Sequence, residues 1–149
     1  MAKKKQTGSK QGKAKQSFRN LLSPVKIGNV ELKNRIAVAP MQEHMTHEGG
    51  QISEQTLAYI GARAKGGAGL VISGVFLATR LAAKYPLVRS MVLYNQGHQF
   101  GPTLYAERIH YFGSVACAQM APSMGRQSSP YDPAEAVPSA SANLPCRVT

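Results

Sequence analysis

The spacing of hydrophobic and polar positions changes along this chain in a way that separates strands from helices. Residues 25–27 and 30–32 each place apolar side chains on both sides of a charged one, and Gly28-Asn29 lies between them. A two-residue spacer of this kind is typical of a β-hairpin. Residues 35–39 then form a short, nearly continuous apolar run that stops at Pro40. This run predicts a strand buried on both faces, as in a parallel sheet.

A helical spacing follows the polar loop at residues 41–51. Ser53 can cap a helix in which Leu57, Ile60 and Ala64 recur at i, i+3 and i+7 and form an apolar stripe. Gly61 occupies the i+4 place, where it weakens the helix by about 1 kcal/mol relative to alanine. We interpret it as a glycine that lets the helix lie close to a sheet. Gly66-Gly67 ends the helix.

The run at residues 68–73 predicts a second buried strand. Strand, helix and strand in this order form the βαβ unit of a parallel sheet, because the crossover is right-handed. Residues 76–95 are expected to be a long connection with a short extended piece at 91–94.

The same pattern repeats towards the end of the chain. Pro102 is tolerated in the first turn of a helix that continues through residues 104–112 and ends at Gly113. Residues 115–120 predict a third strand, and the proline-rich residues 121–149 predict a long surface segment. Three parallel strands with two helices leave a sheet edge and an apolar face uncovered. We therefore expect these elements to be the opening part of something larger.

Length and composition narrow the class of protein. The chain has 149 residues, of which 43% are hydrophobic, a content typical of one globular domain. It is well short of the roughly 250 residues of a closed eight-fold β/α barrel. The apolar stretch at residues 66–78 is interrupted by Ser73 and is too short to cross a bilayer, which needs about 20 apolar residues. No membrane span is predicted.

The positive charge is concentrated at the N-terminus. The formal net charge is +11, and residues 1–20 carry seven lysines and arginines without an acidic residue, which leaves +4 for the rest. Such a segment cannot bury enough apolar surface to order itself, so we predict a disordered basic tail at 1–20 and the folded part at 21–149. The tail has no apolar run of a secretory signal. We interpret it as a solubilising leader, which disfavours nucleic acid as a partner.

The cysteines and histidines do not form a metal-binding pattern. Cys117 and Cys146 lack a CxxC spacing, which favours free thiols in a reducing cytoplasm, and Cys117 lies in an apolar run that predicts a buried side chain. His44 and His47 form HxxH in a loop, without the glutamate of the zinc-binding HExxH helix. His98 and His110 are expected on the exposed surface. Nothing in the sequence indicates an oligomeric state.

Three blocks of sequence together resemble a known family. The first runs from Leu22-Ser23-Pro24 to Arg35-Ile36 and continues with Ala39-Pro40-Met41. The second is the ARAKGGAGLVISG segment at residues 62–74, and the third is AQM at 118–120 followed by GRQ at 125–127. In order and approximate spacing they resemble the Old Yellow Enzyme family, specifically the NADH:flavin oxidoreductase branch that includes 2,4-dienoyl-CoA reductases.

The resemblance implies a fold and an activity. The fold class is α/β, a (β/α)8 TIM barrel that is incomplete here, with an N-terminal hairpin, roughly three strands and two helices. The implied activity is that of an FMN-dependent NAD(P)H oxidoreductase, which transfers hydride to an activated C=C bond of a small unsaturated substrate. The reductant is NADH or NADPH. We expect these 149 residues by themselves to be inactive and to bind FMN poorly.

The resemblance also assigns roles to residues. It places Ala39, Pro40, Met41 and Gln42 along the isoalloxazine ring, Gly74 where a small residue leaves room for the ring, Gln119 on the flavin's pyrimidine edge, and His44 against the substrate. A glutamine amide both donates and accepts, as that edge requires. Gln42 departs from the threonine or cysteine often found there in the wider family. The family's substrate-binding His-His or His-Asn pair, its flavin-neutralising arginine and its phosphate site come from later strands, so no catalytic residue is assigned in this chain.

The residues alone leave other interpretations open. Pro40 can simply end a strand, Gly74 can relieve a turn, and Gln119 can be a satisfied core amide. Two other functions also stand beside the oxidoreductase: a small basic protein whose tail contacts nucleic acid, and a barrel portion of other chemistry, such as an aldolase. A bound yellow chromophore after addition of FMN would favour the oxidoreductase over these two alternatives.

Overall fold

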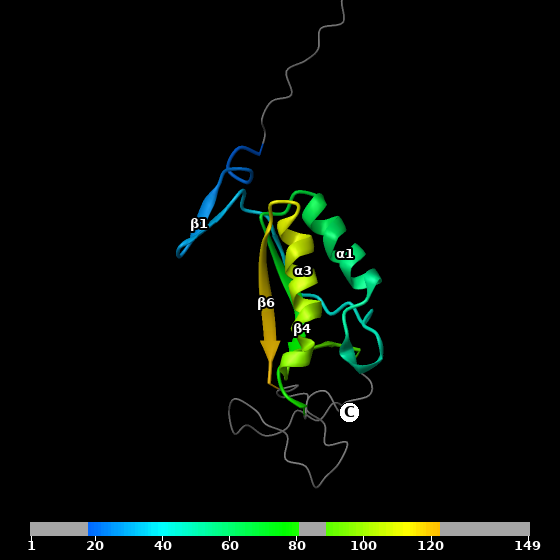
Figure 1. Cartoon of the computed structure of the whole chain (residues 1–149). Coiled ribbons are helices and arrows are strands. Elements are labelled where there is room, and N and C mark those ends of the chain that lie inside the picture. The colour runs from blue at the N-terminus through cyan, green and yellow to red at the C-terminus, as the bar shows by residue number, and fades with distance from the viewer. Residues whose placement is uncertain (1–17, 81–88, 123–149) are drawn as a thin grey trace, which may run out of the picture.

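The computed structural model describes residues 18–80 and 89–122 of the chain (Figure 1). The basic tail predicted at residues 1–20 lies almost entirely outside the described residues, and so does nearly all of the surface segment predicted at 121–149.

The predicted hairpin is confirmed. Strand β1 (Val25–Ile27) pairs antiparallel with β2 (Val30–Leu32), and Gly28 takes a positive φ of 56° in the turn between them. The hairpin lies beyond the amino-terminal ends of the long strands (Figure 1). Just after β2, the Lys33 ammonium donates to the carbonyl of Phe112 at 2.7 Å, which ties this segment to the helical layer.

A parallel sheet is built around one long central strand. Strand β4 (Leu70–Leu77) pairs along one edge with β6 (Val115–Ala121). Its other edge is shared by β3 (Ala37–Val38) near the start and β5 (Met91–Val92) near the end. The predicted parallel order of three strands is therefore confirmed, and the extended piece predicted at 91–94 is the short fourth strand.

Two helices cover one face of this sheet (Figure 1). Helix α1 (Glu54–Lys65) begins at Ser53, whose hydroxyl accepts from the backbone N–H of Thr56 at 3.2 Å, as predicted. Helix α3 (Phe100–His110) carries Pro102 in its first turn. Short 3₁₀ turns, η1 (Glu48–Gly50) and η2 (Gln96–His98), precede the two helices.

The core lies between the helices and the sheet. It includes Leu57 and Ile60 of α1, Ile109 of α3, and Val71 and Phe76 of β4. Gly61 belongs to this layer, but our interpretation of it was wrong. A β-carbon there would lie 3.2 Å from the Arg108 side chain of α3, so the missing side chain lets α1 approach α3 rather than the sheet.

Strand β4 is longer than the predicted strand at residues 68–73. It continues to Leu77 through a bulge, at which Ser73 and Gly74 stand opposite Ala118 alone. The Ser73 hydroxyl accepts from the backbone N–H of Gln119 at 3.0 Å and donates to the Gly74 carbonyl at 2.7 Å. These bonds compensate for the interrupted ladder, so the strand continues where the glycine suggested an end.

Two burial predictions were wrong. Residues 35–39 were expected to be buried on both faces, but Ala37 and Ala39 are exposed. Cys117 was expected in the core and is also exposed. The sheet register places Ala37 beside Leu70 and Cys117 beside Ile72, on the face turned away from the two helices. No described element covers that face, so apolar side chains there remain in contact with solvent.

Candidate functional site

The loop after β3 packs directly on the glycine of the β4 bulge. A β-carbon on Gly74 would lie 2.5 Å from the Met41 carbonyl oxygen and 3.3 Å from the Cα of Gln42. Real β-carbons do not approach backbone atoms so closely, so only glycine fits at this position. The structure thus brings together three predicted site residues, Met41, Gln42 and Gly74, although they come from separate strand–loop segments.

Gln119 joins this group through the bulge. Its backbone N–H binds Ser73, the residue before Gly74, and the register pairs Gln119 with Val75. The Gln119 side chain is exposed, so it is not the buried core amide that the sequence alone allowed. It lies on the strand next to Gly74, near the carboxyl end of the sheet.

The predicted flavin-facing residues differ in exposure. Ala39 and Pro40 are exposed, and Met41 keeps 48% of its surface accessible. Gln42 is half-buried, because its side-chain amide donates to the hydroxyl of Ser90, just before β5. The surface at the carboxyl end therefore offers small and apolar groups with an accessible glutamine amide beside them. A flat ring system with a hydrogen-bonding edge fits such a surface.

His44 lies in the same loop in an unusual backbone conformation. Its φ is 54°, a left-handed value that is uncommon for a residue with a side chain, and its imidazole is exposed. Nearby, the buried hydroxyl of Thr46 has no hydrogen-bond partner within the described residues. Among those residues, no three histidine, cysteine or acidic side chains gather as a metal site would require.

Sequence reasoning missed Glu43, which is half-buried in the same loop. One carboxylate oxygen lies 2.6 Å from the place of a Gly74 β-carbon, and the other accepts a long hydrogen bond from the Tyr105 hydroxyl at 3.5 Å. Burial, and secondly the Glu43 charge, raise the pKa of Tyr105 far above its ordinary range. The only signal in the sequence was an acidic residue three positions after the proline that ends the apolar run.

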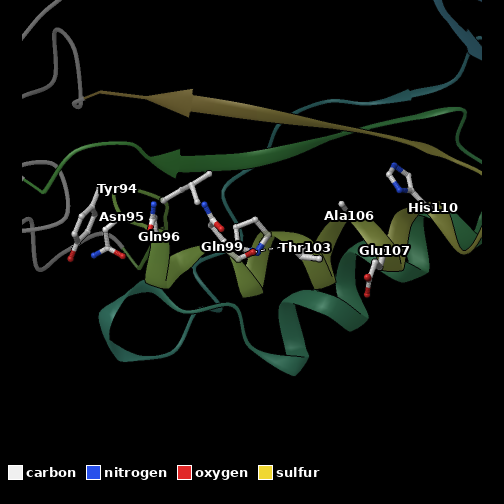
Figure 2. A pocket seen from close by; sticks show the side chains of 10 residues that line it. Tyr94, Asn95, Gln96, Gln99, Thr103, Ala106, Glu107 and His110 are labelled. Atoms are coloured by element: carbon white, nitrogen blue, oxygen red, sulfur yellow. Dashed lines mark hydrogen bonds between the residues drawn. The ribbon is translucent and has the colours of Figure 1, made fainter.

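A large groove of about 880 Å³ lies elsewhere, along α3 (Figure 2). Gln99, Thr103, Ala106 and His110 follow one flank of the helix in Figure 2, and residues 93–96 close one end. The predicted exposure of His110 is confirmed. None of the predicted site residues lines this groove within the described part of the chain. It runs along the helical layer, and its end at residues 93–96 directly follows β5 at the carboxyl end of the sheet.

A smaller cavity of about 390 Å³ lies where α1 and α3 begin. Its lining includes Ile52, Phe100 and His98. His98 was expected on the exposed surface but is half-buried, because its ring packs against Tyr94 with 4.4 Å between ring centroids. Its Nδ1 is buried and has no hydrogen-bond partner among the residues described.

The fold and this arrangement define a class of protein. Parallel strands joined by helices on one face, with an N-terminal hairpin beyond their amino ends, form part of a β/α barrel. The candidate residues gather at the carboxyl ends of the strands, where the active sites of such barrels lie. No helix in the described ranges is long and apolar enough to cross a bilayer.

Comparison with known proteins places the chain more narrowly. It belongs to the NADH:flavin oxidoreductase / NADH oxidase family, whose model matches residues 20–147. It is 31% identical to an NADH oxidase of Thermoanaerobacter brockii over 87% of this chain and 20% of that protein. It is 29% identical to a cinnamate reductase of Clostridium sporogenes over 78% of this chain and 18% of that protein. The chain thus spans about a fifth of the length of these relatives.

Solved structures agree with this placement. A 2-naphthoyl-CoA reductase in complex with 2-naphthoyl-CoA superimposes with a TM-score of 0.67 at 31% identity, over 73% of this chain and 16% of that one. An Old Yellow Enzyme from Pichia sp. AKU4542 gives a TM-score of 0.64 at 25% identity, over 72% of this chain and 27% of that one. The resemblance inferred from the three sequence blocks is confirmed, as is the incomplete barrel.

Proposed function

We propose that this chain forms the flavin-facing N-terminal part of an FMN-dependent NAD(P)H oxidoreductase of the ene-reductase type. The observation that carries the proposal is the convergence of Met41, Gln42, Gly74 and Gln119 at the carboxyl end of the parallel sheet. These are residues that the family resemblance assigns to FMN. The loop residues, Gly74 and Gln119 come from three segments that are more than 30 positions apart in the sequence, and this supports a shared ligand there.

The residues present suit a flavin. Ala39, Pro40 and Met41 would lie against the isoalloxazine ring, and the accessible Gln119 amide would bind its pyrimidine edge. Gln42 would contribute less through its side chain, because Ser90 already accepts from its amide. When bound, FMN supplies hydride transfer, and the protein orients the ring and tunes its electronics.

The named relatives support a proposal for the substrate class. One acts on cinnamate, and another is solved with 2-naphthoyl-CoA. We propose a small molecule with an activated C=C bond as the substrate, NADH or NADPH as the reductant, and His44 as a residue that contacts the substrate. This chain matches about a fifth of the length of the related NADH oxidase. We propose that the activity also needs the remaining parts of the barrel. The two sparse cysteines are consistent with the cytoplasm.

The test uses nuclear magnetic resonance of the complete 149-residue chain labelled with ¹⁵N. FMN is titrated in, and ribose 5-phosphate serves as a matched control that carries the phosphate without the ring. We expect weak binding in which FMN, but not ribose 5-phosphate, shifts the amide signals of Met41, Gln42, Gly74 and Gln119. A weak complex suffices, because chemical shifts report millimolar affinity residue by residue.

Two results would overturn the proposal. Equal shifts with ribose 5-phosphate, centred on residues 1–20, would indicate anion binding by the basic tail instead. Ring-dependent shifts confined to the groove along α3 would place the ligand in the helical layer. Either outcome would remove the link between the sheet end and the flavin.

A further inference from the structure

We propose that Glu43 is a positioning residue. It anchors the loop after β3 (residues 39–51), called here the flavin-facing loop, to helix α3 through the hydroxyl of Tyr105. This inference rests on the proposed function for its consequence, but its structural part can be tested without a flavin. Glu43 itself reaches towards α3, so it acts on the cofactor through its neighbours Met41 and Gln42.

The first step is the contact between the loop and the sheet. The Glu43 carboxylate and the Met41 carbonyl both occupy space that a side chain on Gly74 would fill, at 2.6 and 2.5 Å from the β-carbon position. The loop therefore cannot move closer to β4. This contact stops the loop from moving towards β4 but does not stop it from moving away. A second contact is needed to keep the loop against the sheet.

Tyr105 supplies that second contact from a rigid place. Its side chain is 3% exposed and belongs to the main core cluster. Its ring packs edge-on against Phe76 of β4, with 6.1 Å between centroids and an interplanar angle of 81°. Because Phe76 lies two residues beyond Gly74, the sheet, α3 and the loop form a closed circuit of contacts.

The chemistry of the pair suits an anchor. The phenol is kept protonated by its burial and by the adjacent carboxylate, so it remains a donor. A carboxylate is the stronger kind of acceptor for such a donor. The 3.5 Å separation is long for this bond, so we expect a modest contribution from it. Gln42 makes a second link, to Ser90, on the other side of the loop.

The experiment compares Tyr105→Phe, Glu43→Leu and Glu43→Gln in the complete chain. Tyr111→Phe is the matched control, because Tyr111 is 82% exposed at the end of the same helix. Glu48→Gln is a second control, an exposed acid in the same loop. Two quantities are measured: the hydrogen-exchange rates, without ligand, of the His47 and Gly50 amides, which donate to the Gln51 and His47 carbonyls in the same loop, and the dissociation constant for FMN from amide shifts.

We expect Tyr105→Phe and Glu43→Leu to speed exchange about ten-fold and to weaken FMN binding about five-fold. Glu43→Gln keeps an acceptor and the side-chain volume, so it should stay within about two-fold of the parent. Both controls should match the parent. Rescue by glutamine separates an anchoring bond from general packing.

The inference is overturned if Tyr105→Phe matches Tyr111→Phe in both measurements, or if Glu43→Gln loses as much as Glu43→Leu. Should Glu43→Leu fail to fold, Tyr105→Phe and Glu43→Gln decide the question by themselves. A parent chain that ignores FMN would contradict the proposed function, while the exchange rates would still confirm or refute the anchor.

Discussion

The two ends of the parallel sheet use their polar groups differently. At the amino end, Asn34 is 8% exposed, donates to the Gly67 carbonyl at 2.7 Å and accepts from the Ile36 N–H at 3.0 Å. Ser114 likewise donates to the carbonyl of Ala68 at 2.6 Å. These side chains bind fixed backbone groups, so they close this end of the sheet.

At the carboxyl end, the predicted polar site residues and Glu43 bind other side chains or remain accessible, although Thr79 there donates to the Pro122 carbonyl at 2.6 Å. Gln42 binds Ser90, Glu43 binds Tyr105, and Gln119 is exposed. Such groups can shift by a rotamer change without breaking the sheet. The comparison teaches that one end of this barrel portion stabilises the fold, while the other keeps groups available for a ligand, as in β/α barrels generally.

The largest expected effect is at the amino end. Asn34→Ala leaves a buried carbonyl and a buried N–H without their partner, and should lower the free energy of unfolding by about 2–4 kcal/mol. Urea unfolding followed by circular dichroism measures it. Asn29→Ala in the exposed hairpin turn is the control. A loss below that of the control would contradict the division between the ends.

Gly74→Ala should have the next largest effect. The added carbon would lie 2.5 Å from the Met41 carbonyl, which should cost about 1–3 kcal/mol of stability and displace the flavin-facing loop. The FMN-induced amide shifts should then disappear. At Gly97 the nearest atom, 3.2 Å away, is at the end of the Asn95 side chain, so Gly97→Ala is a mild comparison. Unchanged FMN shifts in Gly74→Ala would argue against a ligand at this end.

A third effect depends on pH. The pKa of Tyr105 is raised in the folded chain, so above about pH 10 the unfolded chain loses this proton first and binds fewer protons than the folded one. Stability from this group is complete below about pH 10 and should fall by about 1.4 kcal/mol at pH 11. Urea unfolding between pH 8 and 11 measures the free energy of unfolding of the parent chain and of Tyr105→Phe. The variant should lack the decrease that is due to the phenol. Parallel curves for the two chains would contradict the burial of the phenol.

Gln119→Ala should change stability least, by less than about 0.5 kcal/mol, because the side chain is exposed and only its backbone N–H is bonded. FMN affinity should nevertheless fall, by a few-fold in the same titration. Gln119→Ala thus separates ligand binding from stability, whereas Asn34→Ala acts on stability. An FMN affinity equal to that of the parent would remove Gln119 from the site.

Local signals predicted the fold well. The hairpin turn, the Ser53 cap and the glycines that end α1 each act within a few residues, so the sequence displays them directly. The end of β4 was missed because Gly74 is a poor strand residue, and its place in the strand depends on Ser73 bonding to β6. Propensity cannot reveal a bond between residues 46 positions apart.

The candidate site was predictable only in part, and through resemblance rather than periodicity. Gly74 and the loop after β3 were assigned together and do meet. Glu43 was missed because its partner, Tyr105, lies 62 positions later on a helix whose pattern only predicts burial. Cys117 was placed in the core because an apolar run looks the same whether both faces of a strand are covered or only one.

The exposure of Cys117 provides a practical handle. Its thiol lies on the uncovered face of the sheet, two residues before Gln119 on the same strand. With Cys146 replaced by serine, a maleimide dye attached there would sense whatever comes to rest against that face. If labelling of Cys117 becomes slower when a second polypeptide is added, that polypeptide has covered this face. The measurement needs neither enzyme turnover nor a bound flavin.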